Sequence, residues 1–252
     1  MTGKRKAVGA VVGLIALIGS WAFVARFAGF DHTLIASPAN VVSSFASESE
    51  LLFENAWITT REALLGLTLA VGFGFMAAIL LHRWTLLRDA TYPLLISSQS
   101  VPIVVIAPLL VLLLGYGLAP KVLIVALVCF FPIVVSTLDG LRSADPELVR
   151  MMHSLGASRW RTLRLVELPG ALPRFASGVR MASTWVFVAA VFAEYAGSDS
   201  GLGYLIARGT PTFETGRVYA AVVLLVAASL ALYGLMAALE RRLLPWAAHD
   251  RQ

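Results

Sequence analysis

The stretch ALLGLTLAVGFGFMAAILL, residues 63–81, contains no charged side chain. A helix needs about 20 predominantly apolar residues to cross the hydrocarbon core of a bilayer, so this run is long enough to span it. The rest of the chain has the same character: 58% of its 252 residues are hydrophobic, 14% are charged, and the mean hydropathy is +0.80. Soluble domains average about 45–50% apolar and about 25% charged residues. The composition therefore predicts an all-α integral membrane protein.

Similar apolar runs on both sides of residues 63–81 predict about six transmembrane helices. The first lies within residues 1–34, over the uncharged run Ala7–Ala25, and we interpret it as a retained anchor because Phe23-Val24-Ala25 is a poor cleavage site for a signal peptidase. A transmembrane domain then covers residues 35–245, with spans near 63–81, 92–118, 121–138, 174–194 and 219–240, and residues 246–252 form a tail. Ahead of the second span, Ser37 and Pro38 predict the start of a short helix.

The distribution of basic residues predicts the orientation. With both termini in the cytoplasm, 14 of the 20 lysines and arginines fall in cytoplasmic segments, as the positive-inside rule requires. The pI near 9.7 then needs no nucleic-acid partner.

The longest predicted cytoplasmic connection, residues 139–174, carries a helix signal. Asp145 is suited to an N-cap and Pro146 to the first helical position. Apolar residues then recur at helical spacing up to Gly156, a residue that commonly ends helices. A second helical stretch, Ser158–Glu167, is expected to end before Leu168-Pro169. The residues leave three roles open for the first helix: lying on anionic lipid, packing under the bundle, or docking on a partner.

This loop resembles a signature of bacterial ABC importer permeases, in which Glu-Ala-Ala is followed by three residues, glycine, nine residues and Ile-x-Leu-Pro. Here Gly156 and Val166-Glu167-Leu168-Pro169 keep that spacing, whereas Arg150-Met151-Met152 replaces Glu-Ala-Ala. The resemblance covers roughly residues 35–240 and is to the nitrate/sulfonate/taurine family, which includes permeases for thiamine pyrimidine precursors and riboflavin. Other matching stretches are Gly115-Tyr116-Gly117, Phe130-Phe131-Pro132-Ile133 and Gly201-Leu202-Gly203-Tyr204.

The resemblance implies a type I importer permease with a cytoplasmic coupling helix at residues 145–156. Its implied partners are two copies of an ATPase subunit, a second copy of this chain in a homodimer, and an extracytoplasmic substrate-binding protein. ATP and Mg²⁺ would bind the ATPase, because this chain has no phosphate-binding loop of the Gly-x-x-x-x-Gly-Lys-Ser/Thr type. We expect no catalytic residue, cofactor or metal site in this chain. The residues assigned to ATPase coupling are Asp145, Glu147, Leu148, Arg150, Met151, Met152, Leu155, Gly156 and Ala157.

A second set of residues is assigned to the translocation pathway. The span near 92–118 is interrupted by prolines, and broken backbone at membrane depth is tolerated only inside protein or beside a water-filled cavity. An ordinary kinked helix is the alternative. For single serines in a span, hydrogen bonding between helices is the simpler explanation. Glu194 would meet substrate, pair with another segment or brace the Gly201–Gly203 turn, and Arg180, on the same span, would snorkel towards the cytoplasm. The assigned residues are Ser97, Gln99, Pro102, Phe130, Phe131, Ser136 and Glu194.

The favoured function is an ATP-driven importer permease of the bacterial plasma or inner membrane. Its expected cargo is a small organic solute, with a thiamine pyrimidine precursor or a related heterocycle as the substrate. An aliphatic sulfonate, taurine or nitrate importer and an ion-driven secondary transporter are the alternatives. A membrane-embedded hydrolase is disfavoured because neither His-Glu-x-x-His nor Gly-x-Ser-x-Gly occurs.

Overall fold

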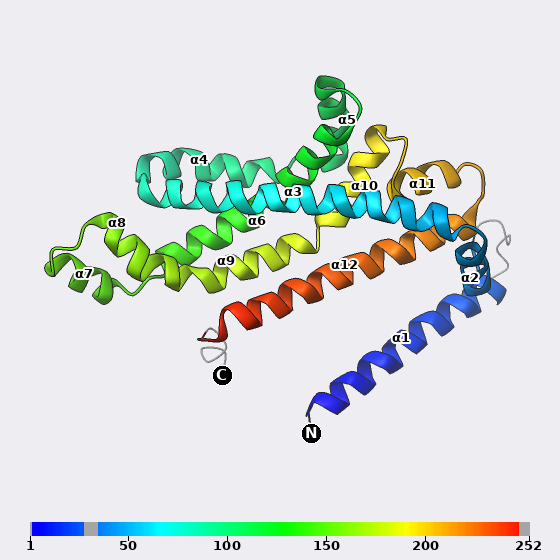
Figure 1. Ribbon diagram of the computed structural model, residues 1–252, viewed down its shortest axis with the longest axis horizontal. Coiled ribbons are helices and arrows are strands. Elements are labelled where there is room, and N and C mark those ends of the chain that lie inside the picture. Colours follow the sequence, from blue (N-terminus) through cyan, green and yellow to red (C-terminus); the bar gives the residue numbers. More distant parts are fainter. Residues whose placement is uncertain (1, 28–34, 247–252) are drawn as a thin grey trace. The chain divides into compact units, whose positions relative to one another are not determined.

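The computed structural model describes residues 2–27 and 35–246, and within these ranges every regular element is a helix (Figure 1). Residues 28–34 and 247–252 of the predicted N-terminal segment and tail lie outside the described residues. The elements are α1 (Thr2–Phe27), α2 (Pro38–Ser47), α3 (Ser49–Arg83), α4 (Thr85–Ser98), α5 (Ile103–Leu114), α6 (Leu118–Arg142), α7 (Pro146–Ser154), α8 (Arg159–Thr162), the π-helical η1 (Leu163–Glu167), α9 (Leu168–Ser183), α10 (Val186–Gly197), α11 (Leu202–Gly209) and α12 (Thr215–Leu243).

Three of the described helices, α3, α6 and α12, are long and apolar enough to cross a membrane singly. The pairs α4–α5 and α9–α10 pass the same test together, although they bend by 102° and 41° at short breaks. This gives three to five candidate spans, so the predicted number of six is not confirmed. Helix α1 covers the predicted first span, and its crossing of the membrane stays a prediction.

Two of the predicted spans differ from the observed helices. The span near 92–118 consists of two helices, because α4 ends at Ser98 and α5 begins after Pro102, which has no backbone donor to continue a helix. The span near 174–194 is also broken, between Ser183 and Val186. No proline lies at this second break, so no local signal in the sequence predicts it.

The chain divides into two compact units, and each has its own core. The first combines Met1–Ile58 with Ser200–Leu225. In it, Trp21 stacks on Tyr219 with ring centroids 5.7 Å apart, and its indole Nε1 donates to the carbonyl of Ala36 at 3.1 Å. Ser37 caps α2 by accepting from Asn40 N, as the sequence predicts.

The second unit combines Thr59–Asp199 with Val226–Gln252, and α6 supplies much of its buried core. Glycines allow neighbouring helices to approach α6 closely, a common device for packing helices in membranes. A Cβ added at Gly178 of α9 would lie 2.7 Å from Ser136 Cβ, and one added at Gly74 of α3 would lie 2.9 Å from Ile133 Cγ2. The connection carrying α7, α8 and η1 leaves from the end of α6 and returns into α9.

Candidate functional site

Helix α7 begins where its capping residues predict. The Asp145 carboxylate accepts a hydrogen bond from Glu147 N at 2.8 Å, satisfying one of the free donors of the first turn. Pro146 occupies the first turn, where its missing N–H costs nothing. A helix of nine residues is therefore fixed in the middle of a connection that would otherwise be irregular.

The end of α7 is a Schellman motif built on Gly156. Its φ of +76° is a left-handed conformation that glycine adopts without strain. Gly156 N donates to His153 O at 3.0 Å, and Ala157 N donates to Met152 O at 2.9 Å. These two bonds satisfy carbonyls of the last turn and reverse the chain. Gly156 thus sets the direction in which the chain leaves α7.

The apolar face of α7 is uncovered in the single chain. Leu148, Met151 and Leu155 are spaced at i, i+3 and i+7, so they share one face, and they are 44%, 51% and 76% exposed. None of the residues of α7 is buried. All nine residues assigned to coupling lie on α7, at its caps or directly after it, and Arg150 is exposed in place of the usual acid.

The return from α7 differs from the sequence prediction. The second helical stretch was expected to end before Leu168-Pro169, and that prediction is wrong. Ser158 caps α8 by accepting from Arg161 N at 3.3 Å, and the chain continues through η1 into α9. Leu168 N donates to Leu163 O across η1, the wider spacing of a π-helix. Pro169 then falls in the first turn of α9, where a proline is tolerated.

Three pathway candidates gather at the break between α4 and α5. Ser97 lies in the last turn of α4 and donates to Pro93 O at 2.9 Å, Gln99 is the C-cap of α4, and Pro102 is the N-cap of α5. All three are exposed in the single chain. The bend therefore presents a small group of uncharged polar residues at the junction of two apolar helices.

The pathway candidates on α6 take part in packing. Phe130 packs against a buried cluster that includes Val134 and Leu138. Ser136 lies where α6 approaches Gly178 of α9. Phe131 is half-buried. Tyr92 and Leu95 of α4 pack against the same cluster as Phe130.

Glu194 belongs to a buried polar cluster. Its side chain is 2% exposed and accepts from Thr59 Oγ1 at 2.6 Å, so it pairs with another segment, one of the three predicted roles. In the same unit, Lys121 Nζ donates to Glu62 Oε1 at 2.8 Å and to Ser198 Oγ at 2.6 Å. These contacts join α3, α6 and α10.

The sequence interpretation missed this cluster and a second ion pair. The predicted span near 121–138 begins at Lys121 and gives it no partner, whereas the residue is 5% exposed inside the second unit and pairs with a glutamate 59 positions away. Arg180 was expected to snorkel. Instead its Nη1 lies 3.0 Å from Glu240 Oε2, joining α9 to α12. A charged residue in an apolar segment signals a partner, but the sequence does not say which one.

A helical chain with several membrane-spanning segments and an exposed, capped helix in a polar connection has the architecture of a transport permease. Residues 70–245 match the family described as binding-protein-dependent transport system inner membrane component, and the chain belongs to this family. It is therefore the permease subunit of an ABC importer. Such subunits are not enzymes, and ATP is hydrolysed by a partner ATPase.

Relatives support this assignment over nearly the whole chain. A probable ABC transporter permease protein from Haemophilus influenzae is 37% identical over 88% of this chain and 90% of its own length. A riboflavin transport system permease protein from Chloroflexus aurantiacus is 37% identical over 96% of this chain and 91% of its own length. A formylaminopyrimidine transport permease protein from Halalkalibacterium halodurans is 32% identical over 90% of both. A putative aliphatic sulfonates transport permease protein from Bacillus subtilis is 30% identical over 96% of this chain and 90% of its own length.

A solved structure shows the same fold. The inward-facing MetNI methionine ABC transporter contains a chain that matches with a TM-score of 0.67 at 17% identity, covering 76% of this chain and 95% of that one.

Proposed function

We propose that this chain forms the translocation pathway for a small heterocyclic solute, of the thiamine-pyrimidine-precursor or riboflavin kind. The observation that carries the proposal is that relatives at 37% and 32% identity are named for riboflavin and for formylaminopyrimidine. Relatives named for aliphatic sulfonates or taurine are 30–31% identical to this chain.

The charge of the candidate pathway favours the same choice. Residues 90–120, which contain the α4–α5 break, include no charged side chain. An anionic sulfonate or nitrate would gain from a cationic partner along its route, whereas a neutral heterocycle needs hydrogen bonds and apolar or aromatic contact. Gln99 supplies hydrogen-bonding groups at the break, and Tyr116, 84% exposed, supplies an aromatic ring after α5.

The exposed face of α7 supports the proposed assembly. Leu148, Met151 and Leu155 have the spacing of a helix that docks in an apolar groove, and the proposed groove belongs to the ATPase subunit. Two copies of this chain and two ATPase subunits form the proposed importer, and an extracytoplasmic binding protein delivers the solute. Both termini and α7 then lie in the cytoplasm. Membership of an ATP-driven family supports this arrangement over the ion-driven alternative.

The test is reconstitution of the chain with its ATPase and binding protein in proteoliposomes. We expect ATP hydrolysis and uptake to rise when the binding protein is loaded with a pyrimidine precursor or riboflavin, but not with taurine or an alkanesulfonate. Stimulation by the sulfonates alone would overturn the substrate proposal. Uptake that persists without ATP and collapses with an uncoupler would overturn the ATP-driven mechanism.

A further inference from the structure

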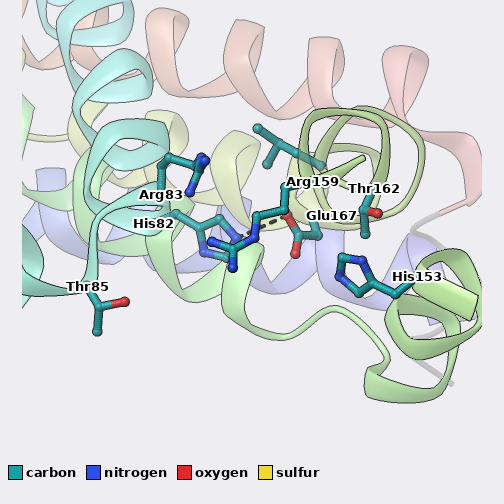
Figure 2. A pocket seen from close by; sticks show the side chains of 8 residues that line it. His82, Arg83, Thr85, His153, Arg159, Thr162 and Glu167 are labelled. Carbon is teal, nitrogen blue, oxygen red and sulfur yellow. Dashed lines mark hydrogen bonds and ion pairs between the residues drawn. The ribbon is translucent and has the colours of Figure 1, made fainter. Parts of the chain in front are cut away.

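A cavity of about 320 Å³ opens between the end of α3 and the segment that follows α7 (Figure 2). His82 and Arg83 line it from α3, His153 from the last turn of α7, and Arg159 from α8. All of these residues belong to the second unit. The cavity therefore lies between the candidate membrane span α3 and the proposed coupling helix.

The cavity has an excess of cationic groups. Glu167 is the one carboxylate among its lining residues, and it is already bonded to His82 Nε2 at 3.1 Å. The guanidinium groups of Arg83 and Arg159 have no hydrogen bond or ion pair with another described residue. His82 Nδ1 is buried and has no hydrogen-bond partner among the described residues. Figure 2 shows these side chains around the His82–Glu167 pair.

Phosphate is the anion that this chemistry fits. Two guanidinium groups provide planar forks of N–H donors that match phosphate oxygens, and hydrogen bonds between charged partners are stronger than neutral ones. The hydroxyl of Thr85 adds a neutral donor at the rim. The volume lies at the lower end of the range for ligand pockets, about 300–1,000 Å³, so it accommodates a phosphate with a small substituent.

The surroundings favour a lipid phosphate over a free one. The cavity lies at the end of α3, a candidate span. Next to it, Trp84 is 54% exposed and Leu86 is 86% exposed. Tryptophan is enriched at the membrane–water interface, and exposed leucine is suited to contact with acyl chains. Basic pockets at the cytoplasmic ends of spans bind anionic headgroups.

From this geometry we infer that the cavity binds the phosphate of an anionic phospholipid and holds the end of α7 against α3. The assignment to the cytoplasmic leaflet rests on the orientation under the proposed function, whereas the phosphate chemistry does not. A bound headgroup would bridge Arg83 on the span and Arg159 beyond the Gly156 turn. ATPase coupling would therefore depend on anionic lipid.

The test is native mass spectrometry of the purified full chain titrated with phosphatidylglycerol or phosphatidylcholine. We expect phosphatidylglycerol to bind at least about tenfold more tightly, and Arg83→Gln with Arg159→Gln to remove that preference. The matched control is Arg161→Gln with Arg164→Gln, which removes two exposed arginines that do not line the cavity. The control should keep the preference within about twofold. The single variants Arg83→Gln and Arg159→Gln serve if the double variant folds poorly.

Inorganic phosphate is the second probe, because it separates the two sources of the same chemistry. The lipid assignment would be overturned by three results together. Millimolar phosphate would bind the chain without lipid, the double variant would lose that phosphate binding, and the native chain would bind the two lipids equally. Equal binding of the two lipids by the native chain would overturn the proposed site. So would an equal loss of lipid preference in the test and control variants. A double variant that keeps the lipid selectivity would show that these arginines do not hold the phosphate, and it would overturn the site. The isolated chain needs neither ATPase nor solute for this assay, so failure of the importer proposal is distinguishable from failure of the site.

Discussion

Replacing Lys121 by methionine should destabilise the permease strongly, because it removes one member of a buried ion pair. The Lys121 and Glu62 side chains are 6% and 3% exposed, and the Nζ–Oε1 distance is 2.8 Å. Methionine fills most of the volume of the lysine side chain but leaves the Glu62 carboxylate without its ammonium partner. It also removes the bond from Nζ to Ser198 Oγ.

Removing one partner of a buried ion pair lowers the free energy of unfolding by about 3–5 kcal/mol, since the remaining charge stays in a medium of low dielectric constant. For a chain of this length, 1 kcal/mol corresponds to about 2–4 °C in Tm, so Lys121→Met should melt about 6–20 °C lower. The assay is thermal unfolding of the detergent-purified chain followed by intrinsic fluorescence. Adding Glu62→Gln should recover part of the loss, because the second substitution removes the unpaired charge.

Arg161→Met is the matched control, because Arg161 is an exposed cation in the same unit. It should change the free energy of unfolding by less than about 0.5 kcal/mol. A Lys121→Met protein that melts within about 2 °C of this control would show that the pair contributes nothing measurable. The buried cluster would then not be the element that holds α3, α6 and α10 together.

Three further predictions concern the turn after α7, the α6–α9 packing and the first unit. Gly156→Val should speed amide exchange at Ala157 about 5–30-fold, because a β-branched residue strains at φ +76°, whereas Gly156→Asn should change it little. Gly178→Val should lower Tm by about 2–12 °C, because its Cβ would lie 2.7 Å from Ser136 Cβ, while Gly72→Val, with open space around it, serves as the control. The hydrogen bonds from Arg217 lower the pKa of the Glu48 carboxyl below 4.5. Their stabilising effect should therefore be present above pH 4.5 and disappear as the pH falls through the lowered pKa, and hydrogen exchange in α2 should show that acid dependence in the native chain but not in Glu48→Gln.

The parts of the fold that local rules control were predictable from the sequence. The starts of α2 and α7 follow from Ser37-Pro38 and Asp145-Pro146, and the end of α7 follows from Gly156, because capping depends on a few neighbouring residues. The break before α5 follows from Pro102 for the same reason.

Features that depend on distant contacts were not predictable in this way. The partner of Lys121 lies on another helix, so hydropathy alone does not identify it. The break between α9 and α10 has no proline, and the continuation through η1 depends on a wider hydrogen-bond spacing that no local motif announces. The cavity at the end of α3 is lined by residues from α3, α4, α7, α8 and η1, which lie up to 85 positions apart in the sequence.

In the proposed importer, α7 couples the permease to its ATPase through an exposed apolar face. The most direct measurement compares Leu155→Asp with Ser154→Asp, an exposed polar position one residue away, in complexes copurified with the ATPase subunit. Our account predicts that Leu155→Asp lowers ATPase association or abolishes stimulation by the loaded binding protein, while Ser154→Asp retains both and the two permeases have the same Tm. A Leu155→Asp complex that assembles normally, and in which the loaded binding protein stimulates ATP hydrolysis fully, would contradict it.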